Sequence, residues 1–201
     1  MGGAICTLCC GTEREVSVAC PLDCAYLLDA HRHEKFIDPD PEQIPNRDIE
    51  LSERFLDEHE ALINFTGVSV LDAALKTPGA VDSDAREALE SLIRTYRTRQ
   101  SGLYYETRPA NLLAAAIQQR MQERFQEYQT RLRERAGLSA VRDADILGAL
   151  VFCQRMALSN NNGRRLGRSF LGLLRELVSE AGLTAGPGGV RTRRSSSLVV
   201  P

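Results

Sequence analysis

The chain of 201 residues is 43% hydrophobic and 26% charged, with a formal net charge of −2. These proportions are close to the average for globular proteins, so they exclude a chain that is disordered throughout and a fibrous repeat. The charge is uneven, because residues 1–60 carry 14 acidic and 5 basic side chains, whereas residues 151–201 carry 2 and 8. The two ends can attract each other within a molecule or between subunits, which leaves a homo-oligomer open, or the basic end can attract an anionic partner. No apolar run approaches the ~18 residues of a membrane span, so no membrane is expected.

Five of the six cysteines lie within 19 residues near the N-terminus, and the sixth is distant: Cys6, Cys9, Cys10, Cys20 and Cys24, then Cys153. The residues before Cys6 are too few for a secretory signal, so we expect a cytoplasmic location. In a reducing compartment, clustered thiols bind metal more often than they form disulfides. The cluster therefore predicts a metal site, and an iron–sulfur cluster or thiol redox chemistry stays open.

Two cysteine pairs flank a short segment of alternating side chains. The sequence from Cys6 to Gly11 predicts a turn whose glycine takes a positive φ and whose amides point at the thiolates. Residues 15–18 alternate polar and apolar, as a short strand does. Pro21 suits the first position of a helix capped by Cys20, with Cys24 on the same helix face. The helix N-terminus would then favour the thiolate forms.

This order of cysteine turn, short β-element and helix start resembles small zinc modules of the treble-clef kind over residues 6–34. The expected site is one closed tetrahedral Zn²⁺ held by four cysteines, with Cys10 as a substitute for Cys9: Cys6, Cys9, Cys20 and Cys24. His31 lies about 10.5 Å of helix rise beyond Cys24, too far to share the metal. His31 and His33 are therefore expected at a solvated helix end.

The predicted zinc module covers residues 1–36. After it, three prolines within seven residues predict an extended linker at 37–47. Apolar side chains at helical spacing then predict a helical body at 48–182, a bundle of four to six helices. His59 lies on the first apolar stripe and is expected in the core, and Thr66-Gly67 is expected to break a helix. Residues 183–201 have the composition of a disordered basic tail. The first apolar stripe begins at Leu51 and the fifth at Ile146. Helices are expected to begin at Val68, Asp82, Pro109 and Gly163. The fold class is thus mainly α, with a short β-element in the N-terminal module.

Two arginine-rich segments are candidate anion or nucleic-acid sites. In one, arginines and tyrosines alternate and could stack bases or simply close a gap between helix ends: Arg97, Arg99, Tyr104, Tyr105 and Arg108. In the other, Asn162 would cap a helix whose first turns carry three arginines, namely Arg164, Arg165 and Arg168. Those arginines could bind a phosphate together with the free helix amides, or pair with acids of the same chain.

The chain contains no glycine-rich phosphate loop, no G-x-S-x-G and no H-E-x-x-H, so the sequence indicates no reaction. It favours a non-catalytic, zinc-binding helical protein that acts as an interaction module for a protein or a nucleic acid. The alternative is a redox- or metal-responsive protein in which the cysteine cluster holds iron and sulfur or switches its thiol state.

Overall fold

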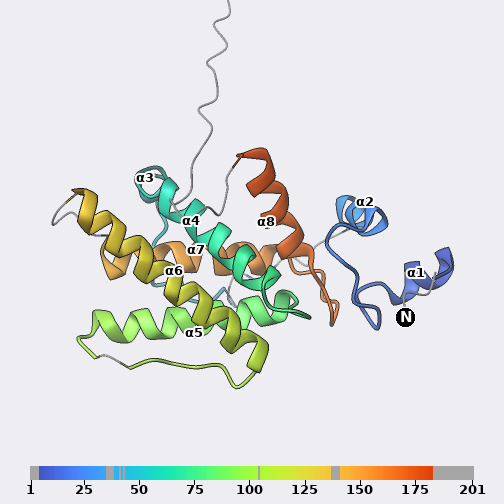
Figure 1. The fold of residues 1–201 in the computed structure, drawn as a ribbon, viewed down its shortest axis with the longest axis horizontal. Coiled ribbons are helices and arrows are strands. Elements are labelled where there is room, and N and C mark those ends of the chain that lie inside the picture. Colours follow the sequence, from blue (N-terminus) through green and yellow to red (C-terminus); the bar gives the residue numbers. More distant parts are fainter. Residues whose placement is uncertain are drawn as a thin grey trace, which may run out of the picture.

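The structure, a computed structural model, describes residues 5–34, 39–40, 42, 44–103, 105–136 and 141–182, without the side chains of residues 135 and 136. Over these residues the chain forms eight helices and one isolated β-bridge but no sheet, which confirms the mainly α fold class (Figure 1). Within the described ranges, no helix combines the length and the apolar character needed to cross a bilayer. The helices are α1 (Thr7–Glu13), α2 (Ala25–His33), α3 (Glu53–Glu58), α4 (Glu60–Leu75), α5 (Asp82–Gln100), α6 (Leu112–Ala136), α7 (Asp143–Ser159) and α8 (Ser169–Glu180).

Helices α4 and α7 form the centre of the helical body, because each buries side chains on every face over two turns. Helix α5 packs on α6 and α7, while α4 packs on α6, α7 and α8. All five helices contribute to one apolar core, with the largest fully buried side chains including Leu89, Phe125, Leu150 and Phe170. Burial of these apolar side chains is the main force that holds the body together.

Two helix boundaries differ from the sequence expectation. Helix α4 runs unbroken through Thr66-Gly67, and the Thr66 hydroxyl donates to the Leu62 carbonyl at 2.8 Å within the helix. A Cβ on Gly67 would lie 3.4 Å from the side chain of Leu174, so this glycine serves close helix packing rather than a turn. The helix expected across His59 is instead divided there, since α3 ends one residue before it. The His59 ring stacks on Phe55 with centroids 4.4 Å apart.

The N-terminal segment, residues 5–34, folds differently from the expected cysteine turn. Gly11 lies inside α1 and not in a positive-φ turn, and α2 begins at Ala25, so Cys20 and Cys24 do not share a helix face. Residues 14–18 form a turn closed by an isolated bridge between Arg14 and Val18. Leu22 is buried and belongs to the core cluster of the helical body. The N-terminal segment is thus joined to the body by apolar packing.

The described part of the predicted linker also contacts the body. The Asn46 amide donates to Gln154 of α7 at 2.7 Å, and its oxygen accepts from Arg97 of α5. These contacts fix the far end of the 37–47 segment between two helices. Residues 35–38, Pro41 and Gln43, and the predicted tail at 183–201, lie outside the described residues.

Candidate metal centre and its junction with the helical body

The six cysteines are free thiols in two different environments. Cys6 and Cys9 are exposed, Cys10 and Cys24 are half-buried, and Cys20 is buried. Cys153 is fully buried within α7, and this burial raises the pKa of its thiol to about 12. A thiol in that state is an inert core residue, so metal or redox chemistry belongs to the N-terminal cysteines.

Cys6 and Cys9 form a coupled pair at the start of α1. Cys6 is the N-cap, and its Sγ accepts a hydrogen bond from the Cys9 amide at 3.2 Å. Hydrogen bonds from the Cys9 thiol and amide lower the pKa of Cys6 below the usual thiol value. The same thiol–thiol hydrogen bond raises the pKa of Cys9. Cys6 therefore carries more of the thiolate character, which metal binding and thiol exchange both require.

The second pair occupies the turn before α2. The Cys20 Sγ donates to the Val18 carbonyl at 3.7 Å, and Cys24 is the N-cap of α2. Among the described residues, no three cysteines have their sulfur atoms within 4.8 Å of one another. The four-cysteine zinc site therefore stays a prediction.

A different group of potential ligands does lie within 4.8 Å, and it consists of Glu15, His31 and Glu34. The Glu15 side chain is fully buried. Its Oε2 lies 3.0 Å from His31 Nε2 and accepts a hydrogen bond from the side-chain amide of Asn162 at 2.9 Å. Its Oε1 accepts a hydrogen bond from the main-chain amide of Arg168 at 2.6 Å. With both carboxylate oxygens occupied, these side chains form a hydrogen-bonded junction rather than an open set of metal ligands.

The charges of this junction favour an ion pair. Burial alone would raise the pKa of Glu15, but the hydrogen bond and charge of His31 outweigh it and lower the pKa below the ordinary glutamate value. Burial likewise opposes the charged form of His31, yet Glu15 and then Glu34 raise the pKa of the imidazole. The expectation of a solvated His31 is therefore wrong, whereas His33 is exposed as expected.

Glu34 ties the junction to the loop between α7 and α8, residues 160–168, which we call the arginine loop. Its Oε2 accepts from the Asn162 amide at 3.2 Å and from the Ser169 hydroxyl at 3.1 Å. Its Oε1 is buried without a hydrogen bond, 3.5 Å from the Arg164 Nε. The acidic N-terminal segment and the basic end of the chain thus meet within one molecule.

The arginine loop also holds the main chain of residues 14–20, which we call the docking segment (Figure 1). The Arg164 Nη1 donates to the Arg14 carbonyl at 2.7 Å, and the Leu166 amide donates to the Glu15 carbonyl at 2.8 Å. The Arg168 Nη1 donates to the Cys20 carbonyl at 2.9 Å. These three hydrogen bonds hold the main chain from just after the first cysteine pair to Cys20, the first residue of the second pair.

The helix start predicted at residue 163 is wrong, because α8 begins at Ser169. The carboxylate of Asp82, at the start of α5, accepts from the Phe170 amide at 2.9 Å and from the Leu171 amide at 3.1 Å. Burial raises the pKa of Asp82 to about 7, while these two amides favour its charged form. The first amides of α8 are thus occupied by an acid of the same chain. Arg165 is exposed, and phosphate binding by the arginine loop stays a prediction.

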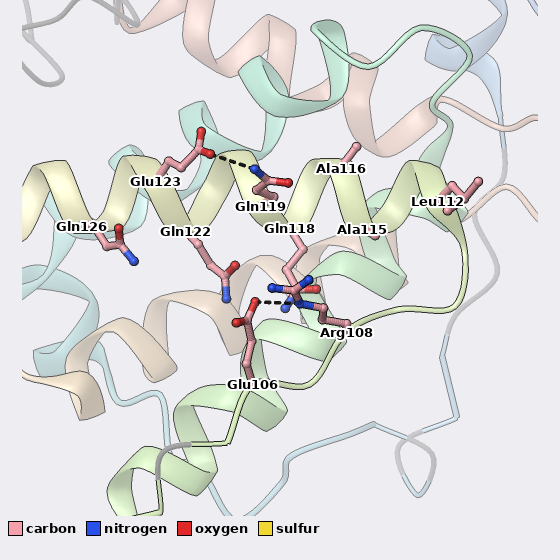
Figure 2. A pocket seen from close by; sticks show the side chains of 10 residues that line it. All are labelled: Glu106, Arg108, Leu112, Ala115, Ala116, Gln118, Gln119, Gln122, Glu123 and Gln126. Carbon is pink, nitrogen blue, oxygen red and sulfur yellow. Dashed lines mark hydrogen bonds and ion pairs between the residues drawn. The ribbon is translucent and has the colours of Figure 1, made fainter.

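The other arginine-rich segment is largely engaged within the chain. Arg97 binds Asp48 at 2.7 Å, and the Arg99 guanidinium lies 4.9 Å from the centre of the Tyr96 ring. Arg108 pairs with Glu106 at 3.4 Å, at the rim of a cavity of about 590 Å³ beside α6 (Figure 2). Figure 2 shows glutamine and glutamate side chains along this cavity, an environment that does not select for an anion. Tyr105 is exposed, and Tyr104 lies outside the described residues.

The junction is the feature that sequence reasoning missed. Glu15 is paired with residues about 150 positions away, and no local pattern marks such a partner. Nothing in the sequence indicates the positive φ of 56° at Glu15 either, since that conformation is uncommon for glutamate. The excess of acidic residues at one end and basic residues at the other was the available signal. Comparisons of the chain with protein-family models, curated proteins and solved structures find no match.

Proposed function

We propose that this chain is a non-catalytic, zinc-binding protein that acts as an interaction module for another macromolecule. Cys6, Cys9, Cys20 and Cys24 hold one Zn²⁺ as thiolates, with Cys10 as the substitute for Cys9. The ion stabilises the N-terminal segment, which is too small to have an apolar core of its own.

The observation that carries this proposal is the contrast between the N-terminal cysteines and Cys153. Four of the five N-terminal thiols are at least partly exposed, and the lowered pKa of Cys6 favours the form that binds metal. Cysteine is among the most buried residue types unless a metal or a reaction requires it elsewhere. Five cysteines in 19 residues, four of them at least partly exposed, therefore favour a metal, and thiolates favour zinc.

The surface of the N-terminal segment supports a protein partner. Leu8 and Tyr26 expose 77% and 72% of their areas, and Ile5 and Val16 are also exposed. A cavity of about 400 Å³ between α1 and α2 lies beside Cys10. Ile5 and Tyr26 both line this cavity, and exposed apolar side chains around a cavity are typical of protein-binding surfaces. Nucleic acid is the other class of partner, and it requires arginines that are not engaged within the chain.

Metal analysis of the full-length protein purified without oxygen tests the zinc site. We expect one zinc per chain and no visible absorption. Cys20→Ser and Cys24→Ser should lose the metal, whereas Cys153→Ala should retain it as the matched control. Loss of zinc in Cys9→Ser but not in Cys10→Ser assigns the fourth ligand. Absence of any bound metal from the wild-type protein would refute the proposal.

Thiol redox chemistry is the second candidate, because of the hydrogen-bonded Cys6–Cys9 pair at the start of α1. A C-x-x-C pair with unequal thiol pKa values is typical of dithiol–disulfide exchange. Titration against a glutathione redox buffer distinguishes the two functions. Reversible formation of a Cys6–Cys9 disulfide with release of metal supports the redox function, and a zinc content that is constant across the titration supports the structural one. Brown colour would instead indicate an iron–sulfur cluster.

A further inference from the structure

The two predicted ligand pairs are separated by the docking segment, and the helical body fixes the shape of that segment. Its Arg14, Glu15 and Cys20 carbonyls accept hydrogen bonds of 2.7, 2.8 and 2.9 Å from the arginine loop. The Glu15 carboxylate adds the 2.6 Å hydrogen bond from the Arg168 amide. The path of the chain from the first cysteine pair to the second is therefore set from outside the N-terminal segment.

We propose that Arg168 is a positioning residue for the zinc site, and that it acts on Cys20 by holding the carbonyl of that residue. This inference rests on the proposed zinc-binding function and extends it to a residue of the helical body. Arg168 is suited to the role because its main-chain amide donates to the Glu15 carboxylate, near the start of the docking segment, and its guanidinium donates to the Cys20 carbonyl at the end.

The geometry of zinc explains why this positioning matters. Zn–S bonds of ~2.3 Å place tetrahedral thiolates about 3.8 Å apart, so a misplaced sulfur cannot bind without distortion. Among the described residues no three sulfur atoms lie within 4.8 Å of one another, so the other ligands must move to Cys20 when zinc binds. A main chain already fixed at Cys20 removes part of the conformational entropy that this movement would otherwise have to overcome. The half-buried Arg168 has a buried Nε without a partner, so its guanidinium is held in place mainly by the Cys20 carbonyl.

The coupling must act in both directions. If the hydrogen bond from Arg168 strengthens zinc binding, then zinc strengthens the contact between the docking segment and the arginine loop by the same factor. The Leu166 amide, which donates to the Glu15 carbonyl, reports on that contact. Its hydrogen exchange in the wild-type protein provides a measurement that needs no substitution.

The test uses full-length wild-type protein and three variants, with zinc affinity measured by competition against a chromophoric chelator. Arg168→Ala should weaken zinc binding roughly tenfold, within the usual range for coupled sites. Arg168→Lys, which can still donate to the Cys20 carbonyl, should recover most of the affinity. Arg175→Ala removes an exposed arginine of α8 and is the matched control, with unchanged affinity expected.

Two further readouts separate positioning from general stability. With Co²⁺ as the probe, the thiolate charge-transfer absorption of Arg168→Ala should weaken or shift while its far-ultraviolet circular dichroism stays that of the wild type. In the wild type, zinc should slow exchange of the Leu166 amide. Equal zinc affinities for wild type and Arg168→Ala, or a Leu166 amide indifferent to zinc, would overturn the inference while the proposed function stands. A wild-type protein that binds no zinc would overturn both.

Discussion

Replacing Glu15 with alanine removes the centre of the junction between the N-terminal segment and the helical body. The carboxylate is fully buried and has three partners, at 2.6 Å from the Arg168 amide, 2.9 Å from Asn162 and 3.0 Å from His31. Removing one member of a buried ion pair typically costs about 3–5 kcal/mol, because the remaining polar groups lose their partner. We expect the docking of the segment to weaken by that amount.

Hydrogen exchange at the Leu166 amide measures this loss, because its acceptor is the main-chain carbonyl of residue 15, which the variant keeps. A loss of 3–5 kcal/mol corresponds to exchange faster by roughly 10² to 10⁴-fold. Glu15→Gly should exchange about fivefold more slowly than Glu15→Ala, since glycine relieves about 1 kcal/mol of strain at the positive φ of 56°. Glu180→Ala, an exposed site on α8, is the control. A Leu166 exchange rate in Glu15→Ala within threefold of the wild type would refute the assigned role of the carboxylate.

Further predictions concern the core, the pH dependence and the thiols. Phe125→Ala removes a fully buried ring, so urea denaturation should show an unfolding free energy lower by about 3–5 kcal/mol, and a loss below about 1 would contradict its core position. The raised pKa of His31 stabilises docking below its ordinary value of 6.5 and loses that effect as the pH rises through the folded value. The lowered pKa of Glu15 stabilises docking above 4.5 and loses that effect as the pH falls. Leu166 exchange, corrected for intrinsic rates, should therefore accelerate both below and above this pH range. His31→Gln should reduce the alkaline change, and the ionisation of Asp82, whose pKa is about 7, accounts for the remainder. In metal-free protein, mass spectrometry should find Cys6 alkylated first by iodoacetamide and Cys153 only after unfolding; early labelling of Cys153 would contradict its burial.

The helical body was predictable because its signals are local and repeated. The apolar stripe on α6 predicts that one helix face packs inward, and it consists of Leu113, Ile117, Met121, Phe125, Tyr128 and Leu132. Its middle members Ile117, Met121 and Phe125 are buried, whereas the other three are half-buried. The acidic Asp82-Ser83-Asp84 predicts the start of α5 at Asp82, which is confirmed. Each of these features depends on neighbours within one or two helical turns, so the sequence alone carries them.

The features that the sequence did not predict depend on distant partners. Gly67 reads as a helix breaker, but its close packing against Leu174 of α8 outweighs the weak helix propensity of glycine. Asn162 reads as a helix cap, yet its amide binds Glu15 and Glu34, and the cap of α8 comes from Asp82 on another helix. Such tertiary contacts decide helix ends without leaving a local signal.

X-ray absorption at the zinc edge of the metal-loaded, full-length protein tests the central claim most directly. The first coordination shell should contain four sulfur ligands at ~2.3 Å and no lighter atoms. Cys20→Ser should reduce the sulfur count or abolish binding, while the spectrum of Cys153→Ala stays that of the wild type. A shell of nitrogen and oxygen at about 2.0–2.1 Å, as Glu15, His31 and Glu34 would supply, would contradict the cysteine site.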